Sequence, residues 1–438
     1  MIRGDEMKEH KSDINIIYGI EDKPELHKAI LLALQHILAM FTANITIPLL
    51  VSGTLGLSSY ETTFLIQCAL LMAGISTFIQ IMKYKGIGSG LPIVMGTSNA
   101  FIATILAITN TYGLGAVFAA SFIGGIFEII IGKNLLKLKK VFTPLVSGIV
   151  VLTIGITLIP VGIRQAAGGK DNMGSISSIL ISLIVIFTIV FLNTRKSKFL
   201  KSSSILIGIL VGYLISYVIG MIDITPVLES NWVAIPMPLV YKWDFKIGAI
   251  VAMLFMYVAT SIETIGDISA LTIGAEGRVA TDEEMSGGVI ADGLSSSLAA
   301  IFNGFPNTSY TQNIGVVNLT GVFSRYVVKI GAIILVVLSL LPKFGSLISI
   351  MPESVLGGAS IAMFSMVAVS GISLLRSVKF NSRNMLIIAL SIGFGVGLSW
   401  VPEAVQQFPR DIQIFLTSGV VPSGILAIIL NTILPIED

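Results

Sequence analysis

Apolar residues occur in long runs along this chain, and short polar stretches separate the runs. Most runs contain about 20 residues, the length that an α-helix needs to cross the hydrocarbon core of a bilayer. An even number of such segments places both ends of the chain on the same side of the membrane. The fourteen segments cover residues 28–51, 61–82, 91–110, 114–132, 141–162, 176–192, 203–222, 246–271, 286–303, 308–321, 326–342, 353–374, 385–400 and 413–430.

The composition supports an all-α polytopic membrane protein. Of the 438 residues, 54% are apolar and 12% are charged, whereas soluble domains have about 25% charged residues. This excludes an ordinary cytosolic enzyme. A net charge of +2 is too balanced for a nucleic-acid binder. The single cysteine, Cys68, excludes a disulfide framework and a cysteine-based metal site.

The distribution of Lys and Arg predicts the orientation. Residues 1–27 contain no apolar stretch with a cleavage site, so no removable signal peptide is expected. With a cytosolic N-terminus, 21 of the 27 basic residues fall in cytoplasmic segments, as the positive-inside rule requires. The six on the other side are Arg164, Lys170, Lys242, Lys246, Lys343 and Arg410.

The fourteen segments divide into two halves of seven. Because seven is an odd number, a duplication would place the second half upside down in the membrane and give two inverted repeats. Faint internal similarity favours this, although glycine is common here and chance is the alternative. Pro144, Gly148 and Gly162 recur as Pro352, Gly357 and Gly371, and Pro92, Thr97 and Asn99 recur 214 residues later as Pro306, Thr311 and Asn313. The predicted parts are an N-terminal cytosolic tail (1–27), a first repeat (28–222), an extracytoplasmic loop (223–245), a second repeat (246–430) and a cytosolic C-terminus (431–438).

The third and tenth segments are poor continuous helices. Glycine and proline interrupt residues 86–101, which include a short β-prone stretch, and Pro306 and a polar run interrupt residues 303–321. Broken segments at corresponding positions of two repeats indicate the binding site of a transporter. Half-helices starting at Ser98 and near Asn313 would direct N–H groups at a shared site in the middle of the membrane.

Three acids lie well inside predicted membrane segments, away from their ends, where a charge costs at least about 2.5 kcal/mol. Glu263 and Asp267 share one helix face, and Asp292 lies in the ninth segment. Hydrogen bonds to neighbouring backbone or side-chain groups could explain the presence of one buried acid. They do not readily explain three, because the segments offer no intramembrane Lys or Arg to pair with them. Loss of hydration disfavours the charged form, so these groups are expected to carry protons. Glu128, near the Lys133 cluster, is expected to reach the interface and to be structural.

His36 is the only histidine within the predicted membrane segments. A lone histidine on an apolar helix is more often a hydrogen-bonded anchor between helices than a ligand. We therefore favour a positioning role near the site, with direct proton transfer as the lesser alternative. So few histidines make a zinc site improbable, and no metal or cofactor is expected.

The tenth segment contains several amide and hydroxyl groups, at Thr311, Gln312, Asn313 and Asn318. Such residues often cap helices, and capping could be the whole role of Asn313. Gln312 offers a donor pair beside an acceptor, which matches an edge with adjacent N–H and C=O groups. A nearby carboxylate such as Glu263 could accept two N–H groups of the same ring. This pair therefore predicts a planar heterocyclic ligand.

The sequence QNIGVVNLTG at residues 312–321 fits the signature Q/E/P-N-x-G-x4-T-[R/K/G] at every fixed place. On this motif the chain resembles the nucleobase–ascorbate transporter family, also called nucleobase:cation symporter-2. The ETIGD stretch at residues 263–267, Gln35 and His36 of the first segment and the Thr-Ser-Asn turn at residues 97–99 also fall at functional elements of that family. The similarity extends over nearly the whole chain.

The resemblance implies two inverted repeats of seven segments, a core domain that moves against a gate domain, and a homodimer. It also implies the roles of the site residues. Glu263 would bind the base and Gln312 its other polar edge, Asp267 and Asp292 would support proton coupling and affinity, Asn313 would tune specificity, and Tyr310 would lie beside the site.

The resemblance also bears on the substrate. Xanthine and uric acid carriers of the family tend to have Gln and Asp where this chain has Gln312 and Asp267, whereas uracil carriers tend to have Glu and His. An oxidised purine is therefore expected. Asn99 departs from the family pattern, because many members have a large aromatic residue there that contacts the base. Phe101 is a candidate replacement.

The sequence thus predicts a proton-coupled symporter of the plasma membrane, with cytoplasmic termini, that imports xanthine or uric acid. A uracil or other nucleobase carrier is the alternative, as is a sulfate-type anion carrier, which the carboxylate of Glu263 would repel. A membrane enzyme would need a metal cluster or a nucleophile with its base, for which the segments contain few residues. A channel would not explain three unpaired acids beside two broken helices.

Overall fold

The computed structural model describes residues 16–135, 143–170, 172–197, 200–201 and 203–435. Within these ranges, eight helices are long and apolar enough to cross a membrane, or up to ten if each of two bent helix pairs counts as one crossing. The chain is therefore a multi-pass membrane protein. Residues 1–15 of the predicted tail, residues 436–438 of the predicted C-terminus, and Lys137, Lys139 and Lys140 of a predicted loop lie outside the described residues.

Long helices occupy most of the predicted apolar segments. The predicted number of fourteen crossings and the inverted repeats remain predictions. The longer helices are α1 (Leu26–Leu55), α2 (Ser59–Ile81), α4 (Leu114–Lys133), α6 (Pro144–Ala166), α7 (Ile176–Asn193), α9 (Ser204–Val218), α11 (Ile247–Glu276), α12 (Asp282–Ile301), α16 (Glu353–Leu375) and α17 (Ser382–Trp400).

The third and tenth segments are broken, as predicted. In the third, strand β1 (Met95–Thr97) leads through the short helix η1 (Asn99–Phe101) into α3 (Ile102–Tyr112). In the tenth, strand β2 (Asn307–Ser309) leads into α13 (Thr311–Thr320). The two strands pair antiparallel, with Gly96 opposite Thr308. Backbone groups that a helix would satisfy internally are thus satisfied between the two segments.

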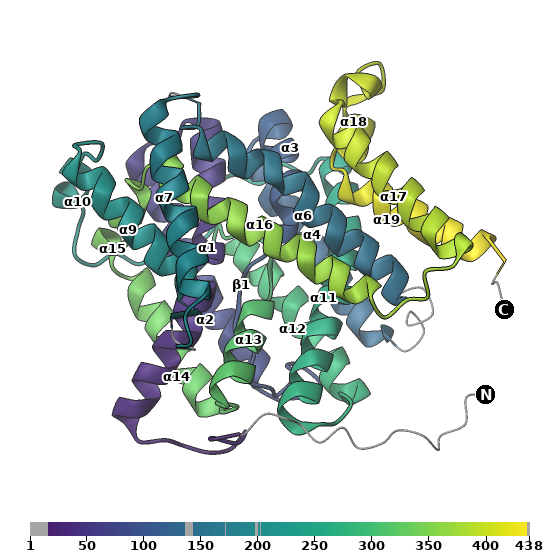
Figure 1. Cartoon of the computed structure of the whole chain (residues 1–438), viewed down its shortest axis with the longest axis horizontal. Coiled ribbons are helices and arrows are strands. Elements are labelled where there is room, and N and C mark those ends of the chain that lie inside the picture. Colours follow the sequence, from purple (N-terminus) through teal and green to yellow (C-terminus); the bar gives the residue numbers. More distant parts are fainter. Residues whose placement is uncertain (1–15, 136–142, 171, 198–199, 202, 436–438) are drawn as a thin grey trace.

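Contacts between helices divide them into two bundles, and Figure 1 shows α2, α12 and α13 of one below α6, α7 and α16 of the other. The strand-containing bundle consists of α1, α2, α3, α4, α11, α12, α13 and α14 (Arg325–Ser339) together with β1 and β2. The outer bundle consists of α6, α7, α9, α16, α17 and α19 (Val420–Ile433). Helix α11 contacts both bundles, because it packs on α4, α12 and α13 and also on α6 and α19.

Glycines allow close approach of α6 and α16 in the outer bundle. A Cβ atom at Gly155 would overlap the backbone of Ala368, and one at Gly371 would overlap the backbone of Leu152. Small residues at such an interface let two membrane helices approach closely. Gly148, Gly162 and Gly357, which belong to the proposed internal similarity, also lie in this interface, against Leu375, Ile361 and Ala166.

Two features differ from the predicted segments. The segment predicted over residues 413–430 is not one continuous helix, because α18 (Arg410–Thr417) and α19 meet at an angle of 75°. Gly419 adopts a φ of 72° at this bend, a conformation that glycine accommodates easily. The short helices α15 (Pro342–Ser349), which meets α14 at 82°, and α10 (Thr225–Glu229) were not predicted.

Part of the predicted N-terminal tail is attached to the strand-containing bundle. The backbone N–H groups of Ile17 and Tyr18 donate to the carbonyl oxygen of Gly321 at 2.8 and 3.2 Å, and Phe323 N–H donates to Tyr18 O at 2.8 Å. The Ser324 hydroxyl donates to Asp22 O at 2.6 Å. This segment therefore fastens the link between α13 and α14.

Candidate functional site

The two strands hold the starts of two short helices together near the centre of the strand-containing bundle. Ser98 N–H donates to Pro306 O at 2.8 Å, and Tyr310 N–H donates to Val94 O at 3.0 Å. The Tyr310 hydroxyl donates to Thr97 O at 2.6 Å. The helix starts predicted at Ser98 and near Asn313 are thus confirmed, with η1 beginning at Asn99 and α13 at Thr311.

Asp267 on α11 receives hydrogen bonds from both parts of the tenth segment. The Ser309 hydroxyl donates to Oδ2 at 2.6 Å, and the Thr311 hydroxyl donates to Oδ1 at 2.8 Å. Both carboxylate oxygens therefore have partners. Asp267 fixes the start of α13 against α11.

Glu263 and Gln312 lie on either side of this junction. Glu263 is one helical turn before Asp267, and Gln312 follows Thr311, so both lie beside the same part of α11. Both side chains are half-buried, and within the described ranges no hydrogen bond reaches either of them. Cβ atoms at Gly266 and Gly315 would meet no atom within 4 Å, so this side of α11 and α13 is open. The carboxylate and the amide are free to bind a ligand.

Asp292 on α12 lies behind the strands and is fully buried. Its Oδ2 accepts hydrogen bonds from the hydroxyls of Thr264, on α11, and of Thr308, the latter at 3.3 Å. Thr264 Oγ1 is also 3.3 Å from Ser309 Oγ, which donates to Asp267. Hydroxyl groups thus connect Asp292 to Asp267.

His36 on α1 contacts Asn313 directly. Nδ1 of His36 is 2.5 Å from Oδ1 of Asn313, and Nδ2 of Asn313 donates to Pro92 O at 2.9 Å. The Pro92 carbonyl fixes the amide orientation, so His36 Nδ1 is the donor to Oδ1. Asn313 therefore joins α1, α13 and the stretch before β1. The interpretation of Asn313 as a helix cap is wrong, because α13 begins without a side-chain cap.

Asn99 and Phe101 have different surroundings. Asn99 is buried, and its Oδ1 has no hydrogen-bond partner among the described residues. Phe101 is fully buried, and its ring centre is 4.8 Å from that of Tyr257. The idea that Phe101 replaces the missing aromatic surface is therefore wrong, because this ring is packed in the core.

Comparison with known proteins identifies the family. The Xan_ur_permease profile, described as a permease family, matches residues 27–404. The chain belongs to this permease family. It is the nucleobase:cation symporter-2 family that the signature in α13 indicated. The permease is thus a transport protein and not an enzyme.

Two relatives match the permease over nearly its whole length. The xanthine permease XanP of Escherichia coli (strain K12) is 36% identical over 440 residues, which cover 96% of this chain and 95% of XanP. The xanthine permease XanQ of the same strain is 34% identical over 448 residues, which cover 97% of this chain and 96% of XanQ.

Solved structures share the fold of the permease. The transmembrane domain of the cyanobacterial bicarbonate transporter BicA superposes with a TM-score of 0.57 at 15% sequence identity, covering 94% of this chain and 98% of that domain. At this identity the likeness concerns the fold alone.

Asn44, which the sequence reasoning missed, also supports the site of the permease. Its Oδ1 accepts a hydrogen bond from Thr97 N–H at 2.8 Å, and its side chain is fully buried in α1. A Cβ atom at Gly96 would lie 2.7 Å from Asn44 Oδ1 and 2.6 Å from the ring of Tyr310, so only glycine fits there. The signal in the sequence was an asparagine in the middle of the first apolar segment.

Glu128 is the second missed residue, and the expectation that it reaches the interface is wrong. Its side chain has no exposed surface. Oε1 lies 3.2 Å from the hydroxyls of Thr260 and Ser261 on α11, which are also within hydrogen-bond distance of the carbonyl oxygens of Met256 (3.2 Å) and Tyr257 (2.7 Å). Glu128 therefore faces α11 inside the strand-containing bundle.

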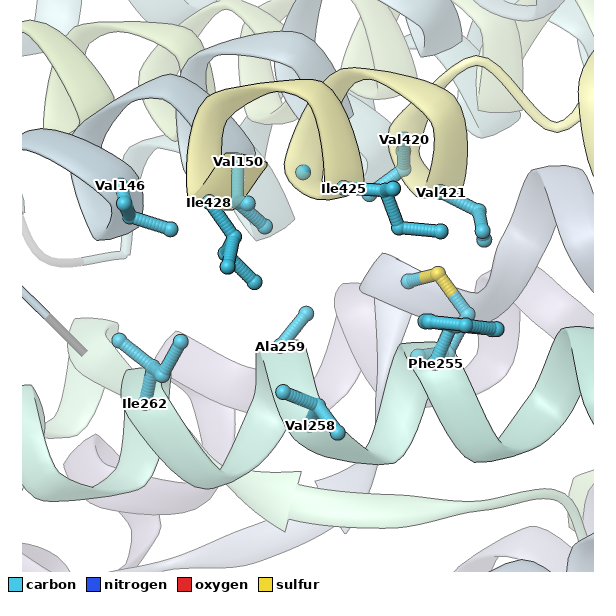
Figure 2. A pocket seen from close by; sticks show the side chains of 12 residues that line it. Val146, Val150, Phe255, Val258, Ala259, Ile262, Val420, Val421, Ile425 and Ile428 are labelled. Carbon is cyan, nitrogen blue, oxygen red and sulfur yellow. The ribbon is translucent and has the colours of Figure 1, made fainter. Parts of the chain in front are cut away.

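An apolar pocket lies where α11 meets α6 and α19 of the outer bundle (Figure 2). Val150, Ala259 and Ile425 are among its lining residues, which are all apolar. Such a lining offers no hydrogen bond to a polar ligand. Ile262, next to Glu263 in sequence, also lines it, so the pocket marks the contact between the bundles beside the site.

Within the part of the chain that the structure describes, no group of three or more His, Cys, Asp or Glu side chains is placed to hold a metal ion. The polar groups near the helix starts belong to α1, α11, α12, α13 and the two strands. This arrangement is suited to binding an organic molecule by hydrogen bonds.

Proposed function

We propose that this permease is a proton-coupled symporter that imports an oxidised purine base, xanthine or uric acid. The observation that carries the proposal is the position of Glu263 and Gln312 beside the start of α13, both without hydrogen-bond partners among the described residues. The similarity to XanP and XanQ over nearly the whole chain supports the choice of substrate.

In this proposal the base is bound by hydrogen bonds on two edges. The Glu263 carboxylate accepts N–H groups of the ring, and the Gln312 amide pairs with an edge that presents C=O beside N–H. Tyr310 and Asn99 lie at the adjoining strand ends and complete the surroundings of the ligand. Asn313 tunes specificity from α13, where His36 holds it in place.

Asp267 and Asp292 provide proton coupling, with the hydroxyls of Thr264 and Ser309 between them. Burial without a cation favours the neutral carboxyl group, so each can take up a proton. One charge moving through 100 mV is worth about 2.3 kcal/mol, which supports roughly 50-fold accumulation per proton. Nδ1 of His36 is occupied by Asn313, which favours a positioning role over direct proton transfer.

Transport follows from movement of one bundle against the other. We assign the strand-containing bundle as the core domain and the outer bundle as the gate domain. The fourteen crossings in two inverted repeats, the homodimer, the plasma-membrane location and the cytoplasmic termini belong to the same proposal. The apolar contact between α11, α6 and α19 can slide without breaking hydrogen bonds, because its lining is apolar.

Two other substrates are possible on this fold. An anion, as in the bicarbonate transporter with a similar fold, would meet Glu263 and Asp267 at the helix starts and be repelled. A uracil carrier would use the same scaffold, but Gln312 and Asp267 stand where uracil carriers of the family tend to have Glu and His. Competition experiments with uracil and xanthine distinguish these substrates.

The test is uptake of labelled xanthine by cells that lack their own carriers, with xanthine, urate, guanine, hypoxanthine and uracil as competitors. We expect competition by xanthine or urate, loss of uptake when the proton gradient is collapsed, and at least ten-fold lower uptake by Glu263→Gln and Gln312→Glu. Glu229→Gln, at an exposed acid on α10, is the matched control.

Normal xanthine uptake by Glu263→Gln would refute the binding assignment. Uptake that is indifferent to the proton gradient would refute the coupling, and competition by uracil but not xanthine would favour the pyrimidine carrier.

A further inference from the structure

Glu128 is an acid that the proposed transport mechanism does not yet use. It lies on α4, its side chain has no exposed surface, and only one of its two oxygens has partners. Oε1 accepts from Thr260 and Ser261 on α11, whereas Oε2 has no hydrogen-bond partner among the described residues. A charged oxygen buried without a partner is unfavourable, which favours the neutral carboxyl group.

Asp292 is the acidic neighbour of Glu128 across the interface between α4 and α12. The two helices approach closely at Gly125 and Gly293, since a Cβ atom on either would overlap the backbone of the other helix. A Cβ atom at Gly293, next to Asp292, would lie 3.0 Å from the Cβ of Glu128. Thr260, which donates to Glu128, and Thr264, which donates to Asp292, are one turn apart on α11, so both carboxyl groups face the same stretch of that helix. Its Oδ1, like Glu128 Oε2, has no partner among the described residues.

No cation faces the two acids from the elements packed around them. Helices α2, α3, α11 and α12 and strand β2 contain no Lys or Arg, and the only one in α4 is Lys133, in its last turn. The other titratable groups near Glu128 are Glu263 and Tyr257 on α11, and the Tyr257 hydroxyl donates to Ser121 O at 3.1 Å. Two neighbouring buried carboxylates without a counter-charge disfavour each other's ionisation, which favours one proton held between them.

We propose that Glu128 and Asp292 share one proton and that this pair stores the coupling proton during transport. The inference rests on the proposed proton coupling and adds Glu128 to it. The proton occupies a carboxyl oxygen of the pair, at Asp292 Oδ1 or Glu128 Oε2, and forms an O–H bond there. It comes from water through Asp267 and returns to water by the same groups.

The structure offers a continuous route for this proton. Asp267 accepts from Ser309, Ser309 Oγ lies 3.3 Å from Thr264 Oγ1, and Thr264 donates to Asp292. Each hydroxyl accepts one proton and passes one on, so none is gained or lost along the route. Thr260, which donates to Glu128, is one helical turn from Thr264 on the same face of α11.

The test compares the wild type with Glu128→Gln, Asp292→Asn and the double variant, each purified and reconstituted in liposomes. The measurements are xanthine binding by calorimetry, xanthine exchange at equal pH on both sides, and uptake driven by a pH gradient with the accompanying proton movement. We expect Glu128→Gln to keep binding within about three-fold and to keep exchange, but to lose at least ten-fold of gradient-driven accumulation. The double variant should be no worse than the more severe single variant, because both changes remove the same shared proton.

Infrared spectroscopy tests the shared proton separately from transport. The C=O band of a protonated carboxylic acid should be present in the wild type and altered in Glu128→Gln. If the wild type binds xanthine but moves no proton, the proposed coupling fails, and the infrared band still decides whether the pair holds a proton. If the wild type is coupled and Glu128→Gln has wild-type uptake, pH profile and infrared band, our inference about Glu128 is wrong.

Ser261→Ala provides a test if Glu128→Gln does not fold. It keeps both acids but removes the hydroxyl 3.2 Å from Glu128 Oε1, together with its bond to Tyr257 O in the same helix, so the pH profile of uptake should shift. Ser269→Ala is the matched control, since that hydroxyl donates only to Ile265 O in its own helix. An unchanged profile in Ser261→Ala would overturn the proposal.

Discussion

The contact between His36 and Asn313 fixes the rotation of α13, and with it the direction in which Gln312 points. We expect His36→Leu to leave Asn313 Oδ1 buried without a donor, which costs about 1–3 kcal/mol. Thermal unfolding in detergent should therefore begin at a lower temperature, and the affinity for xanthine should fall. His36→Gln, which restores a donor, should recover part of both.

His27→Leu is the control for this experiment, because His27 is exposed before the membrane part of α1. Equal unfolding temperatures for His36→Leu and the wild type would contradict a positioning role for His36.

We expect Asn99 to contribute to selectivity rather than to stability. Its Oδ1 has no partner among the described residues, so Asn99→Ala removes no hydrogen bond made by that atom. We expect an unfolding temperature close to that of the wild type and a changed ratio of xanthine to urate competition. A large drop in the unfolding temperature with an unchanged ratio would show that Asn99 is structural.

The sequence predicts the chemistry of single residues better than their contacts. Charged residues within apolar segments stand out, and Glu263, Asp267 and Asp292 were found in this way. The rotation of a helix decides which neighbour a side chain meets, and the sequence alone does not supply it. For this reason the expectation that Glu128 reaches the interface near Lys133 is wrong. Phe101, a candidate replacement for the aromatic surface, packs on Tyr257 instead.

At the scale of helices, close packing of α6 on α16 stabilises the outer bundle. Gly371→Ala should place a methyl group against the backbone of Leu152 and cost about 1–3 kcal/mol through overpacking. We expect a lower unfolding temperature. Gly393→Ala in α17, where a Cβ atom meets nothing within 4 Å, is the matched control and should change little. Similar unfolding temperatures for the two variants would argue against this interface.

The positions of helices were largely predictable, because apolar runs of sufficient length mark them. The helices α10 and α15 were not predicted, because each is much shorter than the apolar run of about 20 residues that marks a membrane-crossing helix. The bend between α18 and α19 depends on the backbone conformation of Gly419, which hydropathy does not reveal. The pairing of β1 with β2 depends on contact between distant segments, so the sequence indicated a break in each segment but not their partnership.

At the scale of the whole molecule, one side of α11 opens towards its C-terminal end. Ala270 and Ile273 are exposed, whereas Leu271 between them is fully buried. With the predicted orientation, this end faces the cytoplasm. We expect Ala270→Cys, in a background with Cys68→Ala, to react with a membrane-impermeant maleimide in inside-out vesicles but not in intact cells. Xanthine should slow the reaction.

The buried position Leu271→Cys is the control and should remain unreactive in both preparations. Labelling of Ala270→Cys in intact cells but not in inside-out vesicles would reverse the proposed orientation.

The antiparallel pairing of Met95–Thr97 with Asn307–Ser309 also constrains how the ribosome can deliver this protein to the membrane. The earlier strand leaves the ribosome some 200 residues before its partner exists, and lipid offers no substitute for the missing hydrogen bonds. During that interval the stretch must remain in water or be shielded by an insertion factor. A nascent chain whose translation is arrested before residue 309 should therefore have a third segment that has not yet inserted into the bilayer.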